Sequence, residues 1–401
     1  MLIKSLKGLV AVSVLGLLGM LAGCSTPCGA SGRLCAPEQA NTSALTGASG
    51  DAALPASAGA HPLAGQAPSA GSATTRIGLL LPLQSATLGT PAAAIRDGFM
   101  TGHERDQAGF TVDVIPTGDS PQEVLKAYTA ALRTHDIIVG PLARAAVAVV
   151  AASGAVSKPT VALNNAAASA ARLPPDMVAI GLSIEDEARQ VAAWAASDHP
   201  HGKALVLTGD AAWQGRIATA FHARWKQLGR AAQTVALSFP GGYLDPAQLA
   251  DLKTRIATDP PDLLFAALDA AQLRQVRAVL ASPVPCYGTS SVNPGVGPGI
   301  DAPELNGVRL VDLPWVIQPD HPAVMVYPRP VADDLPPDLD RLYALGVDAF
   351  RVAREIALQA GAEFTLDGVT GKLKVGGSAF RRTEAAAVYG DGAYQPVAPE
   401  R

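Results

Sequence analysis

Residues 76–81 have the sequence RIGLLL, a short run that is apolar after its first residue. A helical pattern follows at residues 92–103, and the same pairing of an apolar run with a helical pattern recurs along the chain. Short apolar strands that alternate with helices are typical of βαβ units, whose parallel sheet is buried on both faces. The stretch therefore predicts an α/β protein.

The repeats are too numerous for one compact sheet, so we expect two doubly wound, Rossmann-like lobes with a cleft between them. Residues 74–183 begin the first lobe, and residues 184–310 form most of the second. A helix at 338–359 and β-hairpins over 364–394 then return across the lobes. The further strands are predicted at 110–115, 136–139, 159–163, 177–182, 204–207, 234–239, 263–266 and 285–288, and the further helices at 121–133, 142–152, 184–197, 213–228, 246–254 and 270–280.

The first residues of the chain predict export and a lipid anchor. Lysines near the N-terminus precede an apolar run over 8–23, which is shorter than the roughly 20 residues that span a membrane. The run ends in LAGC, residues 21–24, which resembles the lipobox of bacterial lipoproteins, where the cysteine is lipidated. We predict a signal peptide over 1–23 and lipidation of Cys24. An ordinary secretory signal with a chance cysteine is the alternative.

A tether is predicted after the anchor. Residues 36–73 consist almost entirely of Ala, Ser, Gly, Pro, Thr and Asn, and cannot bury enough surface to offset their ordering entropy. Residues 24–73 would form a lipidated N-terminus and a disordered linker with a root-mean-square reach of roughly 40 Å. The folded domain is expected to span 74–401. Ser25 resembles the residue that follows the cysteine in lipoproteins of the outer membrane, so we expect an anchor there, facing the periplasm.

The composition excludes several classes of protein. Of 401 residues, 31 are basic and 35 are acidic, which gives a formal net charge of −4 without a basic block. This balance argues against nucleic-acid binding, and a hydrophobic content of 48% argues against disorder throughout. The 4 cysteines are too few for a disulfide scaffold. Cys28 and Cys35 could form a local disulfide or stay free, and Cys286 is expected to be a buried thiol.

No residue pattern supports catalysis. The chain has no G-x-S-x-G elbow, no H-E-x-x-H and no C-x-x-C, and no lysine has a serine three residues before it. We therefore predict a protein that is not an enzyme and that needs neither a metal nor another cofactor.

Candidate cleft residues follow from topology, because ligands of open α/β sheets bind at the carboxyl ends of strands. Backbone amides and short polar side chains at these ends could hold a small polar ligand. Helix capping is the alternative, above all for Asp210 and Asp269, which precede predicted helices. The candidate cleft residues are Gln84, Ser85, Gly140, Pro141, Asn164, Asp210, Asp269 and Thr289.

The architecture resembles the type I periplasmic binding-protein fold, and a series of motifs is similar to the LppC/LpoA family more specifically. The motifs occur in the order of that family across residues 74–390. They are GLLLPL (78–83), AIRDGF (94–99), IVGPL (138–142), ALN (162–164), GLSIEDEA (181–188), LNGV (305–308), DLPW (312–315), RLYALGVDAF (341–350) and DGVTG (367–371).

The resemblance implies an outer-membrane lipoprotein that binds the periplasmic part of a class A penicillin-binding protein and promotes peptidoglycan synthesis. Enteric members of that family carry a large N-terminal helical-repeat domain, and here only the short linker stands in its place, so we expect a short form. The alternative is a lipoprotein that binds or senses a small, amino-acid-like solute. That alternative is weakened because GPLARA at 140–145 replaces the Ser or Thr hydroxyls that hold a ligand carboxylate in amino-acid-binding relatives.

Trp315 is the candidate for an interface with such a partner. It follows Pro314 in a predicted loop, where an exposed tryptophan is a frequent binding anchor. Packing in the core is the alternative for this side chain.

Overall fold

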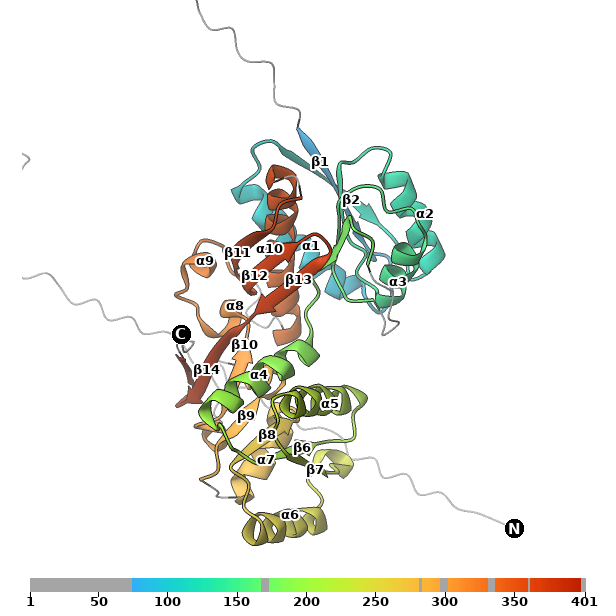
Figure 1. Cartoon of the computed structure of the whole chain (residues 1–401). Helices are drawn as coiled ribbons and strands as arrows, with labels where there is room; N and C mark the ends of the chain where they lie inside the picture. Colours follow the sequence, from blue (N-terminus) through green and yellow to red (C-terminus); the bar gives the residue numbers. More distant parts are fainter. Residues whose placement is uncertain are drawn as a thin grey trace, which may run out of the picture. The chain divides into compact units, whose positions relative to one another are not determined.

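The computed structural model describes residues 74–166, 173–280, 283–295, 302–330, 336–359 and 361–397. These residues form two α/β lobes (Figure 1), which confirms the predicted fold class. The predicted signal peptide, the lipidated Cys24, the Cys28 and Cys35 pair and the linker lie outside the described residues. Within these described ranges, no helix has the combined length and apolarity that a membrane span requires.

The first lobe is built on a five-stranded parallel sheet with the order β2-β1-β3-β4-β5. Helices cover both of its faces, as expected for a sheet whose strands are apolar throughout. The strands are β1 (Thr75–Leu81), β2 (Phe110–Pro116), β3 (Ile137–Val139), β4 (Thr160–Ala162) and β5 (Met177–Ala179), and the helices are α1 (Gly89–Arg105), α2 (Pro121–Ala131), α3 (Arg144–Ala152) and the late α10 (Pro337–Gln359).

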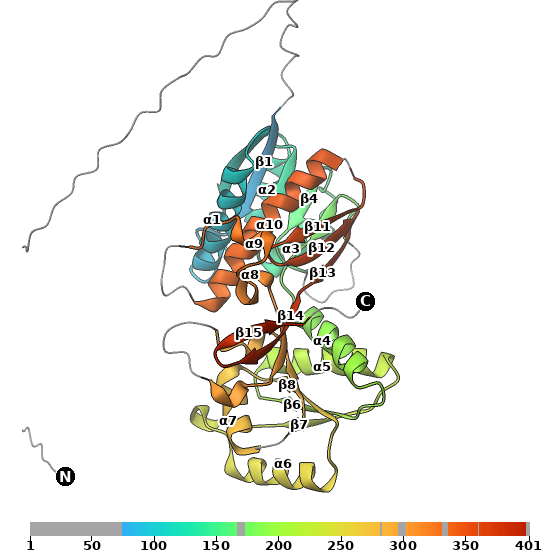
Figure 2. The ribbon, with the colours of Figure 1, turned by 90° about the vertical axis from the view of Figure 1, so that its left-hand side faces the viewer.

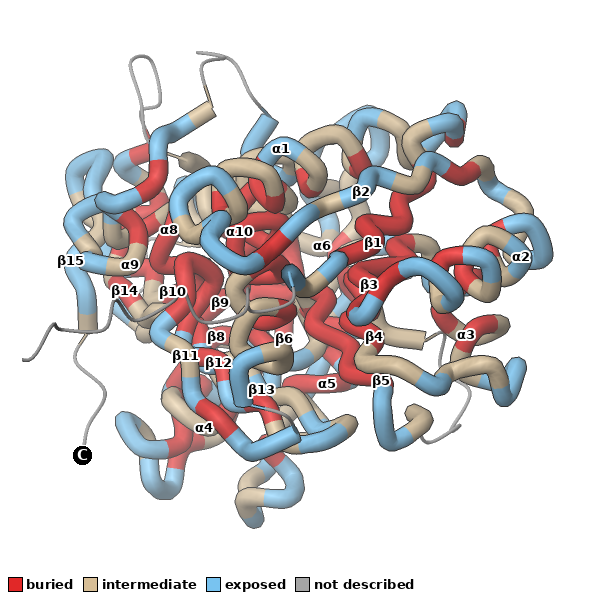
Figure 3. Tube along the Cα trace, turned by 90° about the horizontal axis from the view of Figure 1, so that it is seen from above, coloured by how far each residue is buried: buried red, intermediate tan, exposed pale blue. Residues whose placement is uncertain are grey.

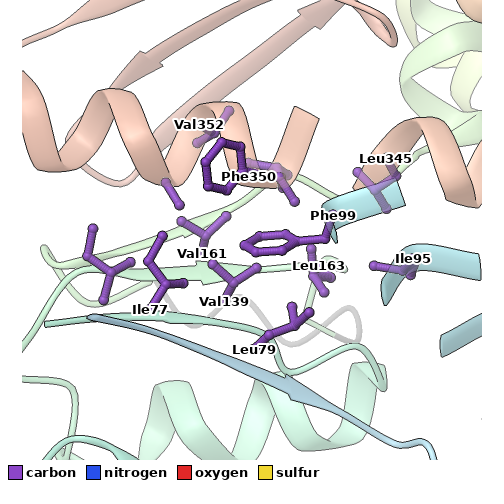
Figure 4. Packing of buried hydrophobic residues seen from close by; sticks show 14 of the residues in the cluster. Ile77, Leu79, Ile95, Phe99, Val139, Val161, Leu163, Leu345, Phe350 and Val352 are labelled. Carbon is purple, nitrogen blue, oxygen red and sulfur yellow. The ribbon is translucent and has the colours of Figure 1, made fainter. Parts of the chain in front are cut away.

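Alternate residues of each strand fill two separate cores. Ile77 and Leu79 of β1 pack toward α1 and α10, where Phe99 and Phe350 meet edge to face with ring centroids 5.4 Å apart (Figure 4). Leu80, the residue after Leu79, packs instead with the residues of α2 and α3. Successive strand residues point to opposite faces, so one apolar run supplies both cores. Burying each such side chain contributes about 1.5–3 kcal/mol.

The second lobe is built on a seven-stranded sheet with the order β15-β14-β10-β9-β8-β6-β7. The helices α4 and α5 cover one face, and α6 and α7 cover the other. Strands β6 to β10 are parallel to one another, whereas β14 runs antiparallel to both β10 and β15. The strands are β6 (Ala204–Thr208), β7 (Ala232–Ala236), β8 (Leu263–Ala267), β9 (Cys286–Gly288), β10 (Arg309–Asp312), β14 (Ala385–Gly390) and β15 (Ala393–Pro396), and the helices are α4 (Ile184–Asp198), α5 (Ala212–Gln227), α6 (Pro246–Thr258) and α7 (Ala270–Leu280).

A third, antiparallel sheet of β11 (Phe364–Gly368), β12 (Gly371–Gly376) and β13 (Ala379–Thr383) adds to the first lobe. Its residues Leu373 and Val375 join the core beneath α10. Figure 2 shows this sheet beside α10, whereas β14 and β15 lie with the second lobe. Figure 3 shows the buried strands enclosed by helices with exposed outer faces.

The chain passes between the lobes three times, after β5, after β10 and after β13. The short helices α8 (Pro314–Ile317) and α9 (Pro322–Met325) follow the second passage. A strand at β10 and the membership of β14 and β15 in the second sheet were not predicted from the sequence. Both depend on pairing between distant residues, such as Asp312 with Ala385.

Helices α1 and α10 cross at unusually short range because each carries a glycine at the contact. A Cβ on Gly98 would overlap the carbonyl oxygen of Tyr343, and a Cβ on Gly346 would overlap the carbonyl oxygen of Ile95. The late helix α10 is thereby held tightly against the first helix of the fold, which fixes where the residues at its N-terminal end lie.

Candidate functional site

The candidate cleft residues of the first lobe lie at strand ends, as predicted. Ser85 is buried, and its Oγ accepts hydrogen bonds from the backbone N–H groups of Thr87 (3.2 Å) and Leu88 (2.8 Å) ahead of α1. Gln84 is exposed, and its backbone N–H donates to the carbonyl oxygen of Thr117 at 3.0 Å. The Ser85 hydroxyl thus closes the turn that precedes α1 and does not cap the helix, whose N-cap residue is Leu88.

Gly140, Pro141 and Asn164 close the ends of β3 and β4. The backbone N–H of Gly140 donates to Val161 at 2.8 Å, and the carbonyl of Pro141 accepts from Leu163 at 3.0 Å. Gly140 has a φ of +117°, and a Cβ there would overlap the carbonyl oxygen of Leu80. The Asn164 side chain accepts from its neighbour Asn165 at 2.9 Å. These contacts explain the residue types by local backbone geometry, and a ligand role for them stays a prediction.

In the second lobe, Asp269 caps α7 by a reciprocal pair of hydrogen bonds with Gln272. Its carboxylate accepts from the backbone N–H of Gln272 at 2.8 Å, and its own N–H donates to the Gln272 side chain at 3.1 Å. Thr289 is fully buried, and its Oγ1 shares a 2.8 Å hydrogen bond with the hydroxyl of Ser291.

Helix capping, the alternative to a cleft role for Asp210, is not observed. Asp210 is exposed, and α5 begins two residues later with Ala211 at the capping position. The backbone N–H of Ala211 donates to Oε1 of Gln214 at 3.1 Å, so a glutamine inside the helix satisfies the helix terminus.

The candidate role of Trp315 as an exposed interface anchor is wrong. The side chain is 0% exposed, and its Nε1–H donates to Oδ1 of Asp340 at 2.7 Å. Its ring packs against Tyr343, and the guanidinium of Arg329 lies 4.0 Å from the ring centroid. The residue belongs to α8, which folds onto α10 instead of forming an open loop. Core packing, the alternative from the sequence, is therefore confirmed.

Cys286 is a buried free thiol, as predicted. Burial raises the pKa of the thiol to about 11, so it stays protonated and unreactive at neutral pH. Among the residues that the structure describes, no group of three or more His, Cys, Asp or Glu side chains is placed to hold a metal ion.

The most elaborate polar arrangement lies where the lobes join. Arg341, near the start of α10, forms a bidentate pair with Asp312 at the end of β10, with distances of 3.0 Å from Nε to Oδ1 and 2.6 Å from Nη2 to Oδ2. Asp312 is 0% exposed and also accepts hydrogen bonds from Asn293 at 2.6 Å and from the backbone of Leu313 at 2.8 Å. The buried carboxylate is thus fully satisfied, as burial of a charge requires.

Glu187 of α4 belongs to the same junction. Its carboxyl accepts a 2.8 Å hydrogen bond from the backbone N–H of Ser290. Burial, together with the negative charge of Asp312, raises the pKa of Glu187 to about 7. A group with this pKa exchanges its proton near physiological pH.

The third passage of the chain is fixed by two further contacts. The guanidinium of Arg382 donates to the carbonyl oxygens of Gly181 (2.9 Å) and Ile180 (2.7 Å), which joins the third passage to the first. The Gln190 side chain of α4 donates to the carbonyl of Glu384 at 2.8 Å and accepts from its N–H at 3.0 Å. These contacts connect the first and third crossing segments with each other and with α4.

The side chain of Glu384 stands out in this region. It is only 8% exposed, and its Oε2 atom has no hydrogen-bond partner in the part of the chain that the structure describes. Burial, reinforced by the nearby carboxylate of Glu187, raises the pKa of Glu384 well above its ordinary value. Glu384 lines two cavities, of about 850 Å³ and about 500 Å³.

Sequence reasoning singled out none of these junction residues as a site. Glu187, Asp312 and Arg341 do occur within the motifs that carry the family resemblance, but the motifs alone gave them no role. The sequence did contain a signal, because these charged residues lie within otherwise apolar segments. Burying a charged side chain costs free energy unless the charge is paired. None of the eight candidate cleft residues lines either of the two cavities.

Two doubly wound lobes joined by three passages define a type I periplasmic binding-protein fold. The chain belongs to the family described as "LppC putative lipoprotein", whose model matches residues 70–383. This membership confirms the family resemblance.

The curated relatives are named as activators. The chain is 27% identical over 336 residues to "Penicillin-binding protein activator LpoA" of Haemophilus influenzae, in an alignment that covers 81% of this chain and 55% of the relative. An activator of the same name from Histophilus somni is 25% identical over 311 residues, which cover 75% of this chain and 51% of that protein. The chain therefore spans about half the length of the curated relatives that it matches.

Two solved structures are similar to the folded part. The LpoA C-domain of Haemophilus influenzae, described as a regulator of PBP1A, has a TM-score of 0.63 and 25% identity, covering 81% of this chain and 100% of that one. A "putative branched-chain amino acid ABC transporter" of Chromobacterium violaceum has a TM-score of 0.67 and 36% identity, covering 79% of this chain and 100% of that one.

Proposed function

We propose that this chain is a lipid-anchored, non-enzymatic activator that binds the periplasmic part of a class A penicillin-binding protein and promotes peptidoglycan synthesis. The observation that carries the proposal is the similarity to the LpoA C-domain over the whole of that domain. In this proposal Cys24 is lipidated at the inner face of the outer membrane, and residues 24–73 tether the folded domain.

The mechanism is differential binding, because an activator can shift its partner's equilibrium only by its preference between the partner's states. A domain whose two lobes are held rigidly together suits this role, because it presents one binding surface. The bidentate pair of Arg341 with Asp312 and the contacts of Arg382 and Gln190 hold the lobes by buried polar groups. The tether adds local concentration at the membrane.

Binding in solution tests the proposal directly. The chain without residues 1–23 and with Cys24→Ser is mixed with the detergent-solubilised class A penicillin-binding protein of the same cell. We expect saturable binding of micromolar affinity or tighter and a faster rate of glycan polymerisation by the partner. A class B enzyme from the same cell is the control and is expected not to bind. Absence of binding to the class A enzyme would overturn the proposal.

The second candidate function is binding of an amino-acid-like solute at the carboxyl ends of the strands. It is favoured by the 36% identity to the transporter-type structure. It is opposed by Ser85 and Asp269, whose side chains already accept hydrogen bonds from backbone N–H groups of their own segments. A thermal-shift titration with leucine discriminates, because a ligand at 100 times its Kd stabilises the folded state by about 2.7 kcal/mol. A flat response excludes leucine as the solute.

A further inference from the structure

The cavity of about 850 Å³ beside Glu384 has the size of a site for a small organic ligand. Both lobes contribute to its lining. Trp194 and Asp198 come from α4 in the second lobe, and Lys372 comes from β12 in the first-lobe sheet. A ligand held there would contact both lobes at once, at a place distinct from the strand ends.

The cavity follows strand β14. Ala385, Ala386 and Val388 line it with small side chains, and Trp194 adds an aromatic ring. From Glu384 to Val388 the strand advances about 13 Å, at about 3.3 Å per residue. Small side chains along this length leave room for a narrow, extended molecule.

Charged groups lie toward both ends of this stretch of the cavity, from Glu384 to Val388. Lys372 pairs in register with Thr383, the residue before Glu384, so its ammonium group belongs to the Glu384 end. Lys372 is exposed and has no ion pair among the residues that the structure describes. Glu384 adds a buried oxygen without a hydrogen-bond partner in those same ranges. Asp367, which pairs in register with Lys372, also lines the cavity, so this end offers a cation, an exposed carboxylate and an unsatisfied carboxyl.

The other end carries a carboxylate. Arg309 pairs in register with Val388, and its Nε lies 4.0 Å from Oδ2 of Asp198. Tyr287 donates its hydroxyl to the same oxygen at 2.6 Å, which fixes the position of the carboxylate. Asp198 is thus held in place at the far end of the cavity from Lys372.

From this arrangement we infer that the cavity binds a short, extended peptide with free ends, its carboxylate at Lys372 and its amino group at Asp198. A chain of about three residues spans roughly 10 Å when extended, which fits between the two charged ends. Small side chains along β14 favour small residues in the ligand. The inference is independent of the proposed activator function, because its site needs no protein partner.

Trialanine is the probe that matches the length and the small side chains of the site. Titration calorimetry with the chain that lacks residues 1–23 and carries Cys24→Ser is expected to give saturable binding at one site. Lys372→Gln is expected to weaken that binding about tenfold, because it removes one charged hydrogen bond. Lys374→Gln is the matched control, since Lys374 lies two residues along the same strand, pairs with Glu363 and does not line the cavity. Its affinity should equal that of the unmodified chain.

A second variant tests the site by filling it. Ser197 is an exposed residue of α4 that lines the cavity, so Ser197→Trp should fold normally and abolish binding. Acetyl-trialanine amide, which lacks both charges, should bind at least about tenfold more weakly. Equal binding of the blocked peptide would overturn the inference in favour of an internal protein segment. Absence of trialanine binding, or unchanged binding in both Lys372→Gln and Ser197→Trp, would also overturn it.

Discussion

Glu187 is a single buried carboxyl group with a consequence for stability. Its pKa is about 7 in the folded chain, against 4.5 for an ordinary glutamate. The folded state therefore holds the Glu187 proton more tightly than the unfolded state does. The stabilisation that the protonated carboxyl contributes is complete below about pH 4.5 and is lost as the pH rises through 7. The difference between the two pKa values corresponds to roughly 3 kcal/mol at most.

Glu187→Gln separates this effect from other titrations. Glutamine keeps an acceptor for the N–H of Ser290 but cannot ionise. We expect the variant to match the unmodified chain at pH 4 and to exceed it by about 1–3 kcal/mol at pH 8, as measured by denaturant unfolding.

Glu185→Gln is the matched control on the same helix. Despite partial burial, the hydrogen bond from Arg216 lowers the pKa of Glu185, so its stabilising contribution is present at high pH and is lost as the pH falls. This variant should therefore be less stable than the unmodified chain at pH 8. A Glu187→Gln chain that is also less stable at pH 8 would contradict the account of Glu187.

The strand-end rule explains how much of the candidate site could be predicted from single residues. It placed Ser85, Asp269 and Thr289 at the correct edges of the sheets, since residue types there follow from local sequence. The rule could not predict the polar contacts where the two lobes join. Glu187 meets Ser290 across 103 positions of chain, and no local pattern encodes that contact.

Among the elements, the contact between α1 and α10 depends most on the absence of side-chain atoms. Gly346→Ala should lower the free energy of unfolding by about 2–3 kcal/mol, because the added methyl group meets the backbone of α1 and cannot be accommodated by side-chain movement. Thermal or denaturant unfolding measures the loss.

Gly215→Ala in α5 is the control for this substitution. A Cβ at Gly215 meets nothing within 4 Å, so alanine there should raise stability by up to about 1 kcal/mol through helix propensity. Equal effects of the two substitutions would show that propensity alone, and not the close crossing, decides the outcome.

The elements that the sequence predicted correctly share a local origin. β1 was predicted over 76–81 and is observed over Thr75–Leu81, and α10 was predicted over 338–359 and is observed over Pro337–Gln359. The apolar period and the flanking residues determine such elements. β10 was missed because its four residues make a strand only beside β9 and β14.

At the scale of the whole molecule, the polar junction should make the two lobes unfold together. Three of the four tryptophans, at 194, 213 and 225, lie on helices of the second lobe, whereas far-ultraviolet circular dichroism reports on both lobes. We expect the denaturant transitions by tryptophan fluorescence and by circular dichroism to coincide. Separate transitions in the unmodified chain would contradict a coupled junction.

Arg341→Ala should break this coupling. It leaves the fully buried carboxylate of Asp312 without its cation, at a cost of about 3–5 kcal/mol, and the two transitions should separate. Arg354→Ala, on the same helix, removes only a partly exposed pair with Glu355 and should cost at most about 1 kcal/mol.

Neither lobe is a continuous piece of the chain. The first core is closed by α10 at Pro337–Gln359, and the second sheet gains its outer strands only at Ala385–Pro396. When the chain is synthesised from its N-terminus, neither core can therefore be completed until α10 and the outer strands β14 and β15 have been added. The order of the segments along the chain makes assembly a late, concerted event, because neither half can become stable before these late segments are available.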